Sequence, residues 1–234
     1  QTINGLPNVA GLTFPDNLAI GMAEQLINLG LDPERWFCAL HLREGTYVQR
    51  PSEPSRDTPI DAYVETAKHI IEEQGGQVVR LGHHGSKPFP KMSGLFDIST
   101  IPDTFNLQAF AITRARYMLA GPSGIAQMGS AFKTPTAVVM APSQEGAWNA
   151  GDIQLNQHLI APGGQRVPLR DSIAAGMRFE PAMKNLIENK GWRLEPNSVA
   201  ELKRVSDIML ERTQEVVGWR ETSSEQFENV PNTL

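Results

Sequence analysis

Residues 36–47 of this 234-residue chain read WFCALHLREGTY, and the fold class follows from this stretch. Its first five residues are all apolar, which is typical of a parallel strand covered by helices on both faces. Polar side chains follow at once, with His41, Arg43 and Glu44 ahead of Gly45. Ligands of open α/β sheets bind beyond the carboxyl ends of such strands, so we expect a functional cluster at these residues.

His41 and Arg43 are two residues apart, so their side chains point to the same side of an extended strand. An imidazole beside a guanidinium forms an anion site, because arginine presents a planar fork of donors and histidine can donate or exchange a proton near neutral pH. An alternative stays open on these residues alone. Arg43 and Glu44 would then form a surface ion pair, and His41 would be a hydrogen-bonded histidine at a strand end.

The bulk composition bears on the partners and the location of the protein. A formal charge of −5 and a pI near 5.6 argue against a nucleic-acid or anionic-membrane partner. The sequence has no run of about 18 apolar residues, so we predict no membrane-spanning helix, while peripheral association with a membrane stays open. It shows no secretory leader, and we expect a cytoplasmic protein. The single cysteine, Cys38, lies in the apolar run and predicts a buried thiol.

Short apolar runs alternate with helical patterns along the chain. This rhythm predicts βαβ units with right-handed crossovers, and therefore a Rossmann-like α/β fold with a mainly parallel sheet and helices on both faces. Strands are expected at residues 36–40, 77–81, 95–98, 117–120, 137–141 and 159–161, and helices at residues 16–29, 61–74, 104–114, 124–132 and 199–217.

We divide the chain into three parts. Residues 1–35 are a lead-in and a connecting helix, and an alternative interpretation is that they are the remnant of an amino-terminal domain. Residues 36–217 form the Rossmann-like domain, and residues 218–234 form a polar tail. Residues 48–59 hold three prolines and no apolar period, so we expect a loop, and its place after the polar cluster makes it a candidate lid.

Polar or glycine-rich segments follow three of the expected strands, at residues 41–44, 80–86 and 121–127. The carboxyl ends of parallel strands line one rim, so these segments can share one crevice. In the third segment, Ser123 and Gly124 open a helix directly after a strand, and the free backbone N–H groups of such an end bind phosphate. The alternative is that Ser123 is an ordinary N-cap.

Other phosphate and metal motifs are absent. Neither GxxxxGK[ST] nor GxGxxG occurs, and GHHGSK at residues 82–87 has the wrong spacing, so nucleotide hydrolysis and dinucleotide binding lose support. His83 and His84 are adjacent and point to opposite sides of an extended segment, and no HxH or HExxH pattern is present. We therefore expect no metal site.

Together these segments resemble the carboxyl-terminal, donor-binding half of a bacterial family of GT-B glycosyltransferases associated with surface-polysaccharide synthesis. The HxR element and the later strand with its SG turn are also distantly similar to fucosyltransferase-type GT-B enzymes. The resemblance covers about residues 36–142, with support from the last long helix. It rests on HLRE at 41–44, Arg56 and Asp57, the helix near Tyr63, GGQVVRLG at 75–82, FDIS at 96–99 and RYMLAGPSGIAQMGSAF at 116–132.

The resemblance implies a nucleotide-sugar donor whose sugar is transferred to a hydroxyl group of a glycan or other acceptor, with no metal or other cofactor. Arg43 would contact the donor diphosphate, and Ser123 and Gly124 would hold the same phosphates with backbone donors. Glu44 or His41 would take the acceptor proton as general base. Further candidates for the donor site are Arg80, Gly82, His83 and Gln127.

Two other functions stay open at this point. The first is a non-catalytic module that binds a nucleotide-sugar or another phosphorylated ligand. The second is a sugar-nucleotide epimerase on the same fold.

Overall fold

The computed structural model describes residues 11–44, 58–143, 149, 151–178, 180–215 and 218–219. In this part of the chain, six strands form one sheet in the order β3-β2-β1-β4-β5-β6, and every neighbouring pair is parallel. The predicted Rossmann-like α/β fold is therefore confirmed. The strands are β1 (Phe37–His41), β2 (Gln77–Leu81), β3 (Leu95–Asp97), β4 (Tyr117–Ala120), β5 (Thr136–Ala141) and β6 (Ile153–Asn156).

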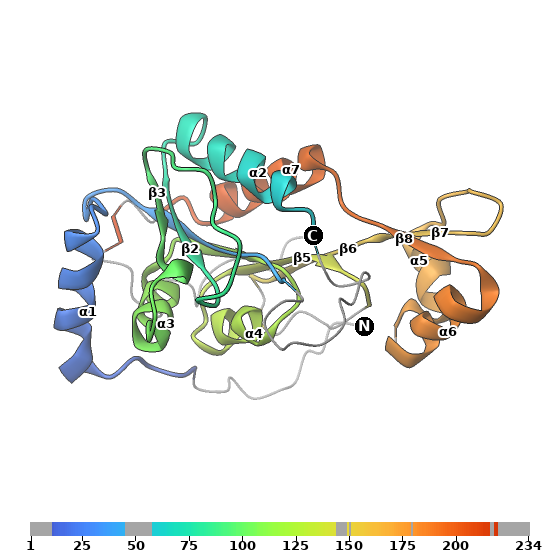
Figure 1. Ribbon diagram of the computed structural model, residues 1–234, viewed down its shortest axis with the longest axis horizontal. Helices are drawn as coiled ribbons and strands as arrows, with labels where there is room; N and C mark the ends of the chain where they lie inside the picture. The colour runs from blue at the N-terminus through green and yellow to red at the C-terminus, as the bar shows by residue number, and fades with distance from the viewer. Residues whose placement is uncertain are drawn as a thin grey trace.

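Helices cover both faces of the sheet. The helices α2 (Ile60–Glu72) and α7 (Val199–Arg212) lie together on one face. The opposite side carries α3 (Phe105–Arg114), α4 (Gly124–Ala131) and, at its edge, α1 (Asp16–Asn28), as Figure 1 shows.

The strand β1 is buried along its whole length and separates two apolar cores. Its side chains alternate, so Cys38 and Leu40 belong to the core under α2 and α7. Phe37 and Ala39 belong to the core under α1 and α3. The apolar run thus has the two-sided burial that a central parallel strand requires.

A smaller unit projects from one end of the main sheet (Figure 1). In it β7 (His158–Ile160) pairs antiparallel with β8 (Arg193–Glu195), and between them lie α5 (Leu169–Ser172), the π-helical η3 (Ile173–Met177) and α6 (Glu180–Lys190). Leu159, Met177 and Leu186 form its core. We predicted the strand at 159–161, but not β6, β8, α5 or α6.

Several expectations about the chain outside the sheet need correction or stay open. Trp219, which we assigned to a polar tail, is only 1% exposed, and its indole Nε1 donates to the carbonyl oxygen of Asp32 at 3.0 Å. The helix expected at 199–217 ends at Arg212, and residues 216–217 lie outside the described residues. Most of the candidate lid, within residues 45–57, also lies outside them. The domain limits stay predictions. None of the described helices combines the length and apolar character needed to cross a bilayer.

Candidate functional site

The carboxyl ends of β1 and β4 lie side by side at the point where the strand order reverses. From β1 the chain continues to β2 on one side, and from β4 it continues to β5 on the other. The backbone N–H of Gly121 donates to the carbonyl oxygen of His41 at 2.8 Å, which places the segments 41–44 and 121–124 next to each other. Such a switch point is where open α/β sheets bind ligands.

The helix α4 begins at this switch point with its N-terminus open. Ser123 is extended and its hydroxyl accepts from the backbone N–H of Ala126 at 3.4 Å, so it is an N-cap. A Cβ atom built at Gly124 would meet no atom of the described residues within 4 Å. The first turn of α4 is therefore uncrowded at Gly124, and Gln127 is exposed in the same turn.

Glycine at position 129 brings α4 close to the sheet. A Cβ atom there would lie 2.4 Å from Oγ1 of Thr136 and 2.8 Å from Sδ of Met118. The helix can reach this position only without a side chain, which fixes the place of its N-terminus at the crevice.

His41 lies almost buried at the base of this crevice. Its side chain is 7% exposed, and Nδ1 is 3.3 Å from the hydroxyl oxygen of Ser123. Burial lowers the pKa of His41 to about 4, with a further contribution from the positive charges of Arg80 and Arg43. The imidazole is therefore neutral near pH 7, where a group of this pKa is a weak proton acceptor.

Arg43 approaches the same segment as His41, as expected for two residues on one side of a strand. Its Nη1 donates to the carbonyl oxygen of Pro122 at 3.4 Å, and its own carbonyl oxygen accepts from Thr58 Oγ1 at 3.3 Å. A Cβ atom at Gly121 would lie 3.1 Å from the backbone nitrogen of Arg43. Glycine at 121 thus allows the two strand ends to lie in close contact.

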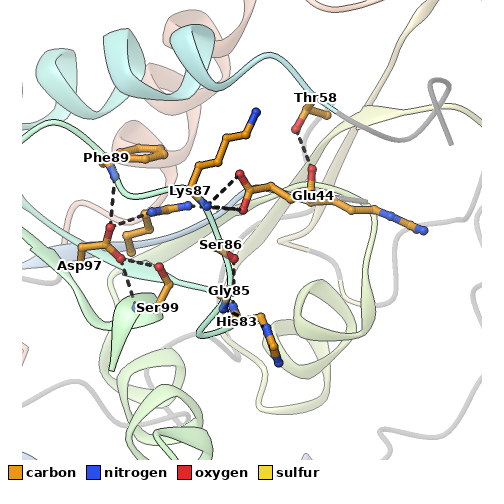
Figure 2. A network of polar contacts seen from close by, with 12 residues as sticks. Glu44, Thr58, His83, Gly85, Ser86, Lys87, Phe89, Asp97 and Ser99 are labelled. Atoms are coloured by element: carbon orange, nitrogen blue, oxygen red, sulfur yellow. Dashed lines mark hydrogen bonds and ion pairs between the residues drawn. The ribbon is translucent and has the colours of Figure 1, made fainter. Parts of the chain in front are cut away.

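Arg80, in contrast, is buried inside the protein. Its side chain is 1% exposed, its Nη1 lies 2.7 Å from Oδ2 of Asp97, and its guanidinium carbon lies 4.2 Å above the ring centre of Phe89. We expected Arg80 to border a nucleotide, but this guanidinium is enclosed by protein groups. Asp97 also accepts from the backbone N–H of Phe89 and from Ser99, as Figure 2 shows.

Glu44 joins β1 to the loop after β2. Its carboxylate accepts from the backbone N–H of Lys87 at 3.1 and 3.4 Å and lies 3.8 Å from Nη2 of Arg80 (Figure 2). The side chain is 13% exposed. A carboxylate at this edge is thus in place, with defined partners in the neighbouring loop.

The remaining predicted residues lie at the same edge of the sheet. Gly82 exchanges two hydrogen bonds with the amide of Gln108, at 3.0 and 2.9 Å, and a Cβ atom there would lie 3.0 Å from Cβ of Ser99. A side chain at position 82 would therefore press on Ser99. His83 is exposed, and its Nδ1 accepts from the backbone N–H of Gly85 at 3.1 Å. Their contacts to a ligand stay predictions.

Within the described ranges, no group of three His, Cys, Asp or Glu side chains is arranged to hold a metal ion. Arg43 and the start of α4 bring positive charge to the crevice.

The fold and this edge define a class of protein: a doubly wound α/β domain with an open helix N-terminus at its switch point. No protein-family model matches the chain, and no curated protein matches its sequence. Solved structures do match. A glycosyl transferase family 9 protein from Veillonella parvula DSM 2008 is 12% identical with a TM-score of 0.54, over 88% of this chain and 55% of that one.

The ADP-heptose lps heptosyltransferase II of E. coli is 15% identical with a TM-score of 0.55, over 90% of this chain and 57% of that one. A UDP-GlcNAc 2-epimerase from Methanocaldococcus jannaschii is 12% identical over 83% of this chain and 51% of that one, but its TM-score of 0.37 is too low to support an argument. The chain thus has the glycosyltransferase-like fold of the first two structures and spans slightly more than half of their length. The similarity to fucosyltransferase-type enzymes stays a prediction.

Proposed function

We propose that this chain binds the nucleotide-sugar donor of a GT-B glycosyltransferase reaction, in which the sugar is transferred to a hydroxyl group of an acceptor. One structure of similar fold is by name an ADP-heptose lps heptosyltransferase, and another is a family 9 glycosyl transferase. We therefore propose a nucleotide-linked sugar as donor and a bacterial surface glycan as acceptor. Because the chain spans little more than half of either structure, the complete reaction is part of the proposal.

The observation that carries the proposal is the open N-terminus of α4 at the switch point. Its backbone donors, with open space at Gly124, suit a diphosphate that carries negative charge. Arg43 lies beside it, with its guanidinium 3.4 Å from the carbonyl oxygen of Pro122, the residue before Ser123. A guanidinium and a helix N-terminus that converge on one place can stabilise the charge that develops on a leaving diphosphate.

Transfer to a hydroxyl group also needs a proton acceptor. Of the two candidates, His41 has a pKa of about 4 because of its burial and the nearby Arg80 and Arg43, which makes it a weak base at neutral pH. Its contact with Ser123 suits it better to orient the start of α4. Glu44 remains the candidate base on this chain.

The proposal is tested by ligand binding. Thermal unfolding would be followed with UDP, GDP, CMP, ADP and dTDP and with their sugars, and the corresponding nucleosides without phosphate are the control. Ligand at about 100 times its dissociation constant should stabilise the folded state by roughly 2.7 kcal/mol. We expect stabilisation by one nucleotide and its sugar, none by the nucleoside, and no change on adding EDTA, because Arg43 and α4 supply the positive charge.

A matched comparison uses Gly124→Ala, which adds one methyl group where there is space, and Gly124→Asp, which adds a negative charge at the proposed phosphate site. Loss of stabilisation in Gly124→Asp alone would support the site. Absence of binding by every nucleotide at millimolar concentration would overturn the proposal.

A further inference from the structure

Three strand ends are joined by one cluster of charged side chains. Glu44 follows β1, Arg80 is the second-last residue of β2, and Asp97 is the last residue of β3. Their side chains are 13%, 1% and 15% exposed, respectively. Two carboxylates therefore share one guanidinium in a region with little contact to water. Such a cluster is sensitive to the loss of any member, because an unpaired buried charge destabilises its surroundings.

The two carboxylates have different roles in the cluster. The oxygen of Asp97 is 2.7 Å from Arg80, whereas the oxygen of Glu44 is 3.8 Å from it. Asp97 is thus the main partner of Arg80. The shortest contacts of Glu44 are with the backbone N–H of Lys87, at 3.1 and 3.4 Å, so its carboxylate chiefly holds main chain.

The main chain that it holds belongs to a basic turn, residues 82–87, of sequence GHHGSK. The turn is closed by its own bonds, because the backbone N–H of Ser86 donates to the carbonyl oxygen of His83 at 2.8 Å. It is attached to the domain at both ends. Gln108 binds the backbone of Gly82, and Glu44 binds the backbone of Lys87.

We propose that Glu44 is a positioning residue, which fastens the basic turn 82–87 beside Arg43 so that this turn borders the same diphosphate as the start of α4. The inference rests on the proposed function. Its geometric support is that Glu44 directly follows Arg43 in the chain and contacts the turn at its last residue (Figure 2). The turn holds two histidines and one lysine and no acidic residue, which suits an anion.

Positioning and proton transfer predict different results for the same substitutions. If Glu44 acts only as a base, Glu44→Ala leaves nucleotide binding intact and lowers turnover alone. If Glu44 positions the turn, Glu44→Ala weakens binding itself. Glu44→Gln keeps an oxygen that can accept from Lys87 N–H, so it should recover most of the affinity that Glu44→Ala loses.

The experiment measures two quantities on the full chain. The first is the dissociation constant of whichever of UDP, GDP, ADP and dTDP wild type binds most tightly. The second is hydrogen exchange of the backbone amides at 82–87. The control is Glu65→Ala, because Glu65 is a half-exposed glutamate on α2 that pairs with Lys68 at 2.6 Å.

We expect Glu44→Ala to bind the nucleotide about tenfold or more weakly, since a hydrogen bond to a charged acceptor is lost. Exchange at Lys87 should accelerate, while amides of β1 and β4 keep the wild-type rate. Lys87→Ala should also bind more weakly, but its amide at position 87 should stay protected, because the backbone bond to Glu44 is retained. Glu65→Ala should match wild type in both measurements.

The failures are distinguishable. If wild type binds none of the nucleotides, the proposed function is overturned, and this inference with it. If wild type binds and Glu44→Ala binds equally well, or leaves the amide of Lys87 as protected as before, the positioning role is wrong while the proposed function stands.

Discussion

Acidification should destabilise this protein through His41. The pKa of His41 is about 4 in the folded protein, against 6.5 for an ordinary histidine, first because the ring is buried and then because Arg80 and Arg43 are close. Between these two values the unfolded chain binds a proton and the folded protein does not. The free energy of unfolding should therefore fall as the pH drops through this window.

The size of the effect follows from the two pKa values. A difference of one pKa unit between the two states corresponds to about 1.4 kcal/mol. At about pH 5 the unfolded form is almost fully protonated and the folded form is mostly neutral, so the loss due to His41 is roughly 2 kcal/mol. Below about pH 4 both forms bind the proton, and this contribution stops growing.

Urea unfolding at about pH 7.5 and about pH 5 measures the loss, and His41→Gln removes the titrating group. The difference in unfolding free energy between the two pH values should be roughly 2 kcal/mol smaller in His41→Gln than in wild type. Gln127→Ala is the control, because Gln127 is exposed and carries no titrating group, so it should show the wild-type difference. An equal difference in wild type and His41→Gln would refute the reasoning, whatever the absolute stability of the variant.

Three further predictions concern the crevice and α4. Arg43→Ala should weaken nucleoside-diphosphate binding about tenfold or more in calorimetry, because a charge-assisted contact is lost, and unchanged affinity would remove Arg43 from the site. Gly124→Asp should leave the unfolding free energy unchanged or raise it by a few tenths of a kcal/mol, because an acidic group suits a helix N-terminus. It should nevertheless abolish diphosphate binding, and binding at wild-type strength would contradict the proposed phosphate position. Gly129→Ala should lower the unfolding free energy by about 2 kcal/mol, because its Cβ would lie 2.4 Å from Thr136 Oγ1. Gly21→Ala, on the open face of α1, should not lower it, and equal urea midpoints for the two variants would count against this packing.

The sequence predicted the sheet because the signals for strands are local. The apolar run 36–40, the alternation of strands and helices and the serine before the helix at 124 each act within a few residues, and the structure has β1, the predicted helices and the Ser123 cap close to those places. The smaller unit was missed except for one strand. Its strands β7 and β8 have three residues each, and more than thirty residues separate them, too far apart for a pattern to reveal the pairing.

Trp219 shows the same limit at the other end of the chain. The residues that follow it in the sequence are polar, so local composition predicted a tail. In the folded protein it packs against Phe37 and Phe110, with ring centres 6.1 and 6.3 Å away. No signal within a short window indicates contacts with residues more than a hundred positions earlier.

For the candidate site, residue types and strand ends were readable from the sequence, because parallel strands necessarily bring their carboxyl ends to one edge. His41, Arg43, Glu44 and Ser123 were expected there, and the structure places them at that edge. Which polar groups face a ligand and which face the interior depended on the tertiary structure. Arg80 is enclosed because Asp97 and Phe89 contact it from a neighbouring strand and loop. His41 is neutral because it is buried and because Arg80 and Arg43 are close to it. Strand order and helix packing, rather than local sequence, bring these groups together.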